Sequence, residues 1–171
     1  MVIARSRYLN PVDIYGKEAS PGAIDASIMA AGNADVVVIA FGEHVYTEKP
    51  GDTDFLELPK ELTAFVADVV AVGTPVVAVL IEGRTRLLEG CLDSAAAVIW
   101  AGLPGPEGGV AIAEVLVGIT SPSGRMPISY PMSSLAGHYP YWHYVDSVCN
   151  YDSGAGAVSH LLVSQAILSQ S

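Results

Sequence analysis

A dense cluster of titratable side chains follows the first long apolar run of the chain. The run covers residues 36–41 and stops at Gly42. The side chains that come next are Glu43, His44, Tyr46, Glu48, Lys49, Asp52 and Asp54. An apolar strand, a glycine and then polar residues are typical of a site at the carboxyl end of a strand in an open α/β sheet. We therefore interpret residues 34–54 as the candidate site and the rest of the chain as the scaffold that holds this loop in place.

Carboxylates in this loop could serve acid–base chemistry. Cleavage of a glycosidic bond, for example, needs one carboxylic acid that protonates the leaving oxygen and a second carboxylate on the other face of the sugar. Glu43 and Glu48 are candidates by position, but spacing alone does not separate such a pair from solvated loop charges. A metal site would use the same oxygen-rich set with His44, yet the spacing matches neither a calcium loop nor a zinc pattern. We expect no metal and no cofactor.

Other motifs argue against nucleotide and serine-hydrolase chemistry. Residues 102–109 read G-L-P-G-P-E-G-G before an expected helix, which matches neither common phosphate-binding pattern. Glu107 would also repel a phosphate at that helix start. The G-x-S-x-G pattern of a nucleophile elbow is absent. The two cysteines, Cys91 and Cys149, form neither a metal framework nor a disulfide scaffold.

Composition indicates one folded domain without an anionic partner. The 171 residues are 51% hydrophobic and 15% charged, which is enough for a sizeable core. The formal net charge of -10 argues against nucleic acid or an anionic membrane as partner. The most apolar window, residues 62–81, is interrupted by Asp68 and by Gly73-Thr74-Pro75, so it reads as helix, turn and strand. Residues 1–30 lack the shape of a signal peptide, and the localisation stays unknown.

Apolar runs and helical spacing alternate along the chain. Runs that are apolar on both faces predict buried parallel strands at Asp35–Phe41, Pro75–Ile81 and Ala95–Ala101, with a short edge strand at Arg125–Tyr130 and another short strand at Val12–Tyr15. Helical spacing predicts helices at Pro21–Ala31, Lys60–Val72 and Glu107–Val117, and a short helix or turn at Arg86–Asp93. The alternation predicts an α/β three-layer sandwich: a mostly parallel sheet of about five to six strands with helices on both faces.

Several blocks of residues, taken in order, resemble one known family. They are F-G-E-H-V-Y-T-E-K-P-G-D at 41–52, L-E-L-P at 56–59, P-V-V-A-V-L-I-E-G-R at 75–84, W-A-G-L-P-G-P-E-G-G-V-A-I-A-E-V-L-V-G at 100–118 and P-S-G-R-M-P-I-S-Y-P at 122–131. Together they resemble the C-terminal α/β-sandwich domain of glycoside hydrolase family 3, the β-glucosidase, exo-glucanase and β-xylosidase group. Each block is weak alone, but their common order is specific.

The resemblance implies roles for individual residues. Family members are typically retaining exo-acting glycosidases in which a (β/α)8 barrel supplies the nucleophile and the sandwich supplies a glutamate as acid/base. By position directly after the strand, that glutamate is predicted to be Glu43, with Glu48 as the alternative. The residues expected to contact substrate are His44, Tyr46 and Trp142, and those expected to brace the loop are Asp52, Arg84 and Arg125. The implied substrate is a β-linked oligosaccharide or glucoside.

The chain also departs from the family pattern. We divide it into an irregular lead-in at 1–20, the sandwich domain at 21–145 and an atypical tail at 146–171 that could be disordered. No barrel precedes the sandwich, so we expect a fragment of a longer enzyme that is inactive alone. Full-length relatives are often secreted, periplasmic or vacuolar. The alternative function is a non-catalytic carbohydrate-binding or domain-docking module.

Overall fold

The computed structural model describes residues 6–88, 90–124, 130–131 and 158–159. Its elements, in chain order, are α1 (Ala23–Gly32), β1 (Val37–Gly42), the 3-10 turn η1 (Lys49–Gly51), α2 (Lys60–Ala71), β2 (Val76–Ile81), β3 (Ala97–Gly102), α3 (Gly108–Leu116), β4 (Tyr130–Pro131) and β5 (Val158–Ser159). In the described part of the chain, no helix is long and apolar enough to cross a membrane.

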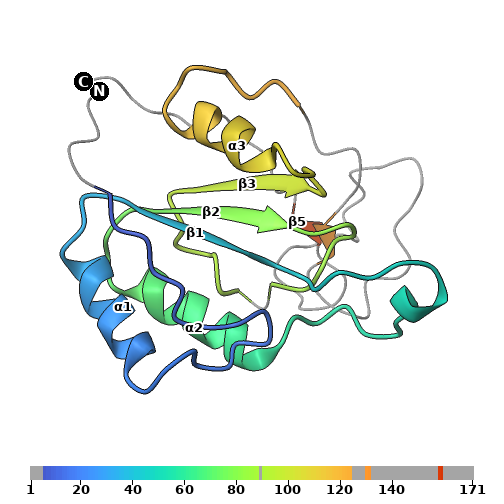
Figure 1. The fold of residues 1–171 in the computed structure, drawn as a ribbon, viewed down its shortest axis with the longest axis horizontal. Helices are drawn as coiled ribbons and strands as arrows, with labels where there is room; N and C mark the ends of the chain where they lie inside the picture. The colour runs from blue at the N-terminus through green and yellow to red at the C-terminus, as the bar shows by residue number, and fades with distance from the viewer. Residues whose placement is uncertain (1–5, 89, 125–129, 132–157, 160–171) are drawn as a thin grey trace, which may run out of the picture.

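The main sheet is parallel, in the order β1-β2-β3. Its strands are short runs rich in valine and isoleucine, whose branched side chains suit a pleated surface covered by helices. Phe41 pairs with Leu80, and Gly42 pairs with Ile81, so β1 and β2 end side by side. The register between β2 and β3 shifts at Leu80/Ile81. Because the strands are parallel, all three carboxyl ends meet at one edge, which is where the polar loop leaves β1 (Figure 1).

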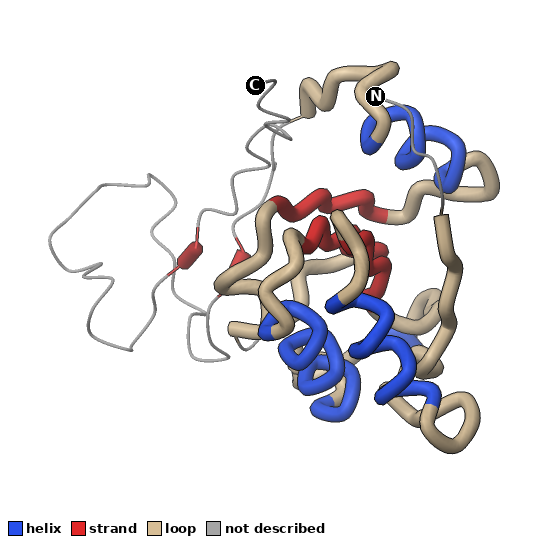
Figure 2. The backbone as a smooth tube through the Cα atoms, turned by 90° about the vertical axis from the view of Figure 1, so that its left-hand side faces the viewer, coloured by secondary structure: helices blue, strands red, loops and turns tan. Residues whose placement is uncertain are grey.

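Helices cover both faces of this sheet. α1 and α2 lie on one face and α3 lies on the other, which gives three layers (Figures 1 and 2). α2 buries an apolar stripe at helical spacing, made of Leu62, Phe65, Val66 and Val69. Burying each such side chain contributes about 1.5–3 kcal/mol, less what the unfolded chain already buries. The core therefore lies between α1, α2 and the sheet, and it fixes the strands from which the loop departs.

The structure confirms the predicted fold class. The three buried strands and three helices of the sheet region form within about two residues of their predicted bounds. Of the five to six strands expected in the sheet, three lie in the described part of the chain. The predicted strand at Val12–Tyr15 is wrong in extent, because Val12 makes only an isolated bridge with Glu18. Within the predicted helix or turn at Arg86–Asp93, residues 90–93 form a turn.

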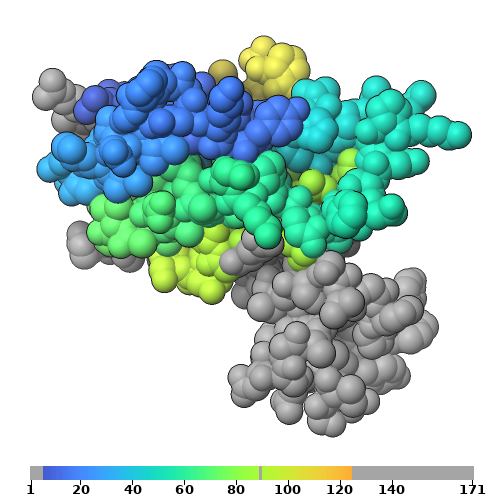
Figure 3. Space-filling view, turned by 90° about the horizontal axis from the view of Figure 1, so that it is seen from below, coloured from blue at the N-terminus to red at the C-terminus, as the bar shows by residue number. Residues whose placement is uncertain are grey.

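The segment after α3 is described only in part. Tyr130–Pro131 pairs antiparallel with Val158–Ser159, apart from the main sheet. Most of the predicted edge strand at Arg125–Tyr130 lies outside the described residues, as does most of the tail at 146–171. The space-filling view toward α1 and α2 shows the loop after β1 as a projection beyond the body of the domain (Figure 3).

Candidate active site

The loop at residues 43–57 leaves the sheet at the carboxyl ends of the strands. Gly42, the last residue of β1, lies so close to β2 that an added Cβ would overlap the carbonyl group of Ile81. The N–H of Glu43 donates to the same carbonyl oxygen at 3.3 Å. A residue without a side chain is therefore required where the loop begins. From there the chain runs outward to η1 at the loop tip (Figure 1).

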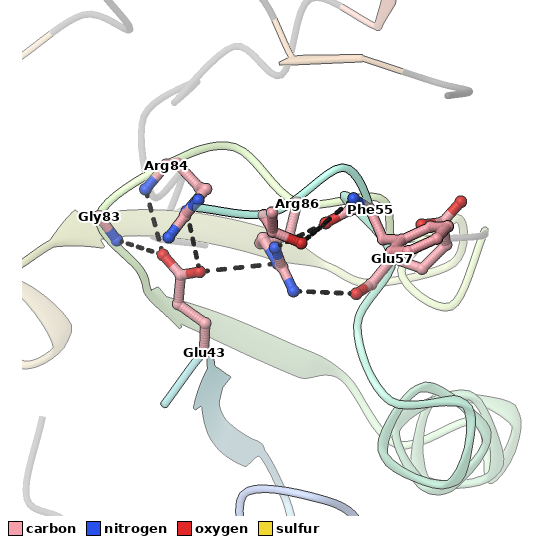
Figure 4. A network of polar contacts seen from close by, with 7 residues as sticks. Glu43, Phe55, Glu57, Gly83, Arg84 and Arg86 are labelled. Atoms are coloured by element: carbon pink, nitrogen blue, oxygen red, sulfur yellow. Dashed lines mark hydrogen bonds and ion pairs between the residues drawn. The ribbon is translucent and has the colours of Figure 1, made fainter. Parts of the chain in front are cut away.

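The carboxylate of Glu43 is enclosed by the turn that follows β2 (Figure 4). Its Oε1 accepts hydrogen bonds from the backbone N–H groups of Gly83 at 2.9 Å and Arg84 at 3.3 Å. Its Oε2 lies 3.3 Å from Nε of Arg84 and 3.6 Å from Nε of Arg86. The side chain of Glu43 is only 3% exposed. Both oxygens are therefore engaged by the protein, and little of the group faces solvent.

Arg86 ties the same carboxylate to the returning limb of the loop. Its guanidinium donates to the carbonyl oxygens of Phe55 at 3.1 Å and Glu57 at 3.0 Å (Figure 4). Sequence reasoning assigned no role to Arg86. The available signal was the E-G-R-T-R run after β2, which places two guanidinium groups two residues apart at the end of a strand next to Glu43. Arg86 thus closes the base of the loop.

Arg84 stacks on Tyr46. The guanidinium Cζ lies 3.8 Å from the centroid of the tyrosine ring, in cation–π geometry. The ring also packs on Gly51, where an added Cβ would overlap it, and the hydroxyl oxygen would lie 2.6 Å from a Cβ added at Gly83. Tyr46 is therefore held between Arg84 and two glycines. Tyr46, which the sequence predicted to contact substrate, thus packs against the loop itself.

Glu48 lies near the loop tip in an unusual backbone conformation. Its φ of 50° and ψ of -142° make it the one non-glycine residue with positive φ among those described. Such a conformation costs of order 1–3 kcal/mol and is common at functional sites. The carbonyl oxygen of Glu48 accepts the N–H of Gly51 at 2.9 Å, which closes η1. The side chain is exposed and makes no hydrogen bond or ion pair with the described residues.

A pocket of about 260 Å³ lies at the base of the loop, where Glu43, His44, Glu57 and Arg86 contribute to its wall. Tyr15 also lines it, with its ring centroid 6.1 Å from that of His44. His44 is exposed. His44, which the sequence predicted to contact substrate, thus lies beside a cavity lined by both aromatic and charged residues.

The other predicted site residues are placed as follows. Asp52 is exposed, and its backbone N–H donates to the carbonyl oxygen of Lys49 at 2.9 Å. Its carboxylate makes no bracing contact with the described residues. Arg125 and Trp142 lie outside the described residues. Within the described ranges, no group of three or more His, Cys, Asp or Glu side chains is arranged to hold a metal ion.

Comparison with protein families identifies the domain. The model of the glycosyl hydrolase family 3 C-terminal domain matches residues 5–158. The chain belongs to glycosyl hydrolase family 3. This membership confirms the resemblance read from the ordered sequence blocks.

Curated relatives in family 3 are much longer than this chain. It is 40% identical over 129 residues to the lysosomal beta glucosidase of Dictyostelium discoideum, covering 75% of the chain and 16% of the relative. It is 36% identical over 121 residues to the periplasmic beta-glucosidase of Salmonella typhimurium, covering 70% and 16%. It is 33% identical over 115 residues to an exo-alpha-(1->6)-L-arabinopyranosidase of Bifidobacterium longum, covering 67% and 15%. The chain therefore spans about 16% of the length of the first of these relatives.

Solved family 3 structures share the fold. The beta-glucosidase of Listeria innocua in complex with gluconolactone superposes with a TM-score of 0.68 at 26% identity, covering 84% of this chain and 22% of that chain. The glucose complex of a beta-glucosidase from the same organism gives a TM-score of 0.63 at 31% identity, covering 70% and 17%. In both, the match covers a minor part of a larger glycosidase.

Proposed function

We propose that this chain is the sandwich half of a retaining, exo-acting β-glycosidase, most closely a β-glucosidase, and that Glu48 is its general acid/base. The observation that supports this residue is its position: the carboxylate is exposed and unengaged by described residues on a loop that projects from the sheet edge. The reaction class rests on family membership and on the names of the relatives, since those from Dictyostelium discoideum and Salmonella typhimurium are named β-glucosidases. The proposed substrate is a β-linked oligosaccharide or glucoside.

The geometry favours Glu48 over Glu43, the residue preferred from sequence. A general acid must bring a proton within hydrogen-bond reach of the leaving oxygen. The carboxylate of Glu43 is 3% exposed, and its oxygens already face two backbone N–H groups and two guanidinium groups. Presenting it to a sugar would break these contacts. Glu48 has none of them to break, so a substrate can approach its oxygens directly.

A second carboxylate is required for a retaining mechanism. The two carboxyl groups of a retaining glycosidase lie about 5–5.5 Å apart on opposite sides of the scissile bond. We propose that the nucleophile comes from a (β/α)8 barrel facing the loop edge of the sheet, as family resemblance implies. A barrel needs about 250 residues, and the chain covers only 16% of the first relatives' length. The loop projects beyond the body of the domain (Figure 3), and in the proposed complex it would carry Glu48 into the cleft between the two domains.

The chemistry then divides into two steps. While the barrel carboxylate attacks the anomeric carbon, Glu48 gives its proton to the glycosidic oxygen and the aglycone leaves. Glu48, now a carboxylate, removes a proton from the water that cleaves the glycosyl–enzyme bond. We place His44 beside the substrate, because it is exposed at the rim of the pocket at the loop base.

The test is complementation of the 171-residue chain with a separately expressed family 3 barrel domain. Turnover is measured on an alkyl β-glucoside, whose leaving group needs a proton, and on a dinitrophenyl β-glucoside, whose leaving group does not. We expect Glu48→Gln to lower kcat/KM on the alkyl glucoside by about 10²- to 10⁴-fold. The effect on the first step of the dinitrophenyl substrate is expected to be small. Azide should restore the second step and yield a glucosyl azide, because azide needs no general base.

Matched variants separate the two glutamates. Asp54→Asn removes one exposed negative charge from the same loop and should leave both activities unchanged. Undiminished turnover of the alkyl glucoside by Glu48→Gln would overturn the assignment, as would azide rescue of Glu43→Gln instead. A mixture that binds saccharide but never turns it over, with affinity insensitive to Glu48→Gln, would support the non-catalytic module and reject the proposal.

A further inference from the structure

Packed groups link the buried carboxylate of Glu43 to the loop tip. Glu43 holds Arg84 by an ion pair at 3.3 Å. Arg84 lies over the ring of Tyr46, with 3.8 Å from Cζ to the ring centroid. Gly51 also contacts the ring of Tyr46, and it packs so closely on the ring that no Cβ fits between them. Gly51 ends η1 and bonds to the carbonyl oxygen of Glu48 at 2.9 Å.

The tyrosine is the central member of this path. An exposed backbone with positive φ at Glu48 persists only where its surroundings hold it there. The ring of Tyr46 supplies a rigid surface with few rotatable bonds, anchored by a guanidinium that is itself fixed by Glu43. Its hydroxyl oxygen lies close to Gly83, in the turn after β2, at 2.6 Å from where an added Cβ would stand. The hydroxyl therefore lies against the turn after β2.

We propose that Tyr46 is a positioning residue: stacked between Arg84 and Gly51, it holds η1 and therefore orients Glu48. This inference replaces the substrate contact expected of Tyr46 from sequence, and it rests on the proposed role of Glu48. It assigns the function to the ring and not to the hydroxyl. Tyr46→Phe keeps the ring and Tyr46→Ala removes it, so the two variants separate positioning from recognition.

The first experiment measures the loop without catalysis. A glutamate-specific protease can cleave the 171-residue chain after exposed Glu48, and cleavage after exposed Glu107 at the start of α3 serves as the internal reference. Tyr46→Ala is expected to raise the rate at Glu48 roughly tenfold relative to Glu107, because loss of the stacking increases the open population of the loop. Tyr46→Phe should match the parent chain. Val45→Ala, at a residue that is 97% exposed, is the matched control and should change neither rate.

Gly51→Ala tests the same contact from the other side. Its Cβ would overlap the ring of Tyr46, so it should raise cleavage at Glu48 without removing the aromatic residue. If Tyr46→Ala does not fold, this variant still decides the question. An unchanged ratio of Glu48 to Glu107 cleavage in Gly51→Ala, or a raised ratio in Tyr46→Phe, would overturn the positioning role.

The second experiment uses the chain complemented with the barrel domain. Tyr46→Ala should lower kcat on the alkyl β-glucoside about 10- to 100-fold at nearly constant KM, and Tyr46→Phe should retain both values. A raised KM with unchanged kcat in Tyr46→Phe would show a substrate contact through the hydroxyl and reject the proposal. The proposed function fails separately, if Glu48→Gln does not alter turnover. In that case the protease ratio still reports whether Tyr46 holds the loop.

Discussion

Replacing Glu43 by glutamine tests whether this residue is structural. The side chain keeps its size, and its amide oxygen can still accept the N–H groups of Gly83 and Arg84. Its charge is lost, so Arg84 and Arg86, which are 26% and 11% exposed, face one another without the counter-charge between them. Removing one partner of a buried ion pair typically costs about 3–5 kcal/mol. Because the two backbone hydrogen bonds can persist, we expect about 3 kcal/mol.

This cost is large compared with the stability of an ordinary domain. Native proteins unfold with a free energy of about 5–15 kcal/mol. For a chain of this length, a loss of 3 kcal/mol corresponds to a fall in Tm of roughly 6–12 °C. Urea unfolding followed by far-UV circular dichroism should show a lower midpoint with an unchanged slope. The difference should persist at high salt, because a buried pair is screened less than an exposed one.

Asp54→Asn is the control for the change in net charge. Asp54 is an exposed carboxylate of the same loop, and its replacement should alter the free energy of unfolding by no more than about 0.5 kcal/mol. If Glu43→Gln and Asp54→Asn unfold at the same urea concentration, the ion-paired cluster does not stabilise the fold. That result would contradict the structural role inferred here for Glu43.

Two further substitutions probe the backbone at either end of this loop. Glu48→Gly should raise the free energy of unfolding by about 1 kcal/mol, because glycine adopts a φ of 50° without strain. The same variant should abolish the activity of the complex with the barrel domain, because the carboxylate is removed. A lower free energy of unfolding would show that the conformation of Glu48 is not strained. Gly42→Ala should lower the free energy of unfolding by about 1–3 kcal/mol, because the added Cβ overlaps the Ile81 carbonyl. Gly109→Ala in α3, where a Cβ meets open space, is the control and should stabilise by about 0.5–1 kcal/mol. Urea unfolding measures all three, and equal effects of the two alanines would refute the close approach at Gly42.

Much of the fold could be predicted from local sequence. The strands Val37–Gly42 and Val76–Ile81 follow from short apolar runs bounded by glycine or proline, and α2 follows from its helical spacing. These signals are local, so they can be recognised without knowing which other elements each strand or helix packs against. The short strand expected at Val12–Tyr15 had a β-branched start but, among the described residues, no neighbour to pair with beyond one bridge. Strand formation depends on such a partner more than helix formation does.

The choice between Glu43 and Glu48 could not be made in the same way. Proximity to the strand end is a local signal, and it favoured Glu43. The groups that engage Glu43 lie about 40 positions away in sequence, at Gly83, Arg84 and Arg86. Only the parallel pairing of β1 with β2 brings them together. The positive φ of Glu48 likewise has no signature in composition. Burial and backbone strain depend on residues distant in sequence, and both led us to propose Glu48 in place of Glu43.

The two fixed limbs of the loop have a consequence for its evolution. Gly42 and Glu43 secure the outgoing limb, and Arg86 secures the returning limb at Phe55 and Glu57. Since the ends are pinned by the scaffold, lengthening the chain between them adds only closure entropy, about 0.6 kcal/mol for each doubling. Residues 52–54, which lie between the contact of Tyr46 with Gly51 and the returning limb at Phe55, can therefore take insertions at little cost in stability. Insertions there would change the surface beside the loop tip, while the domain beneath keeps its stability.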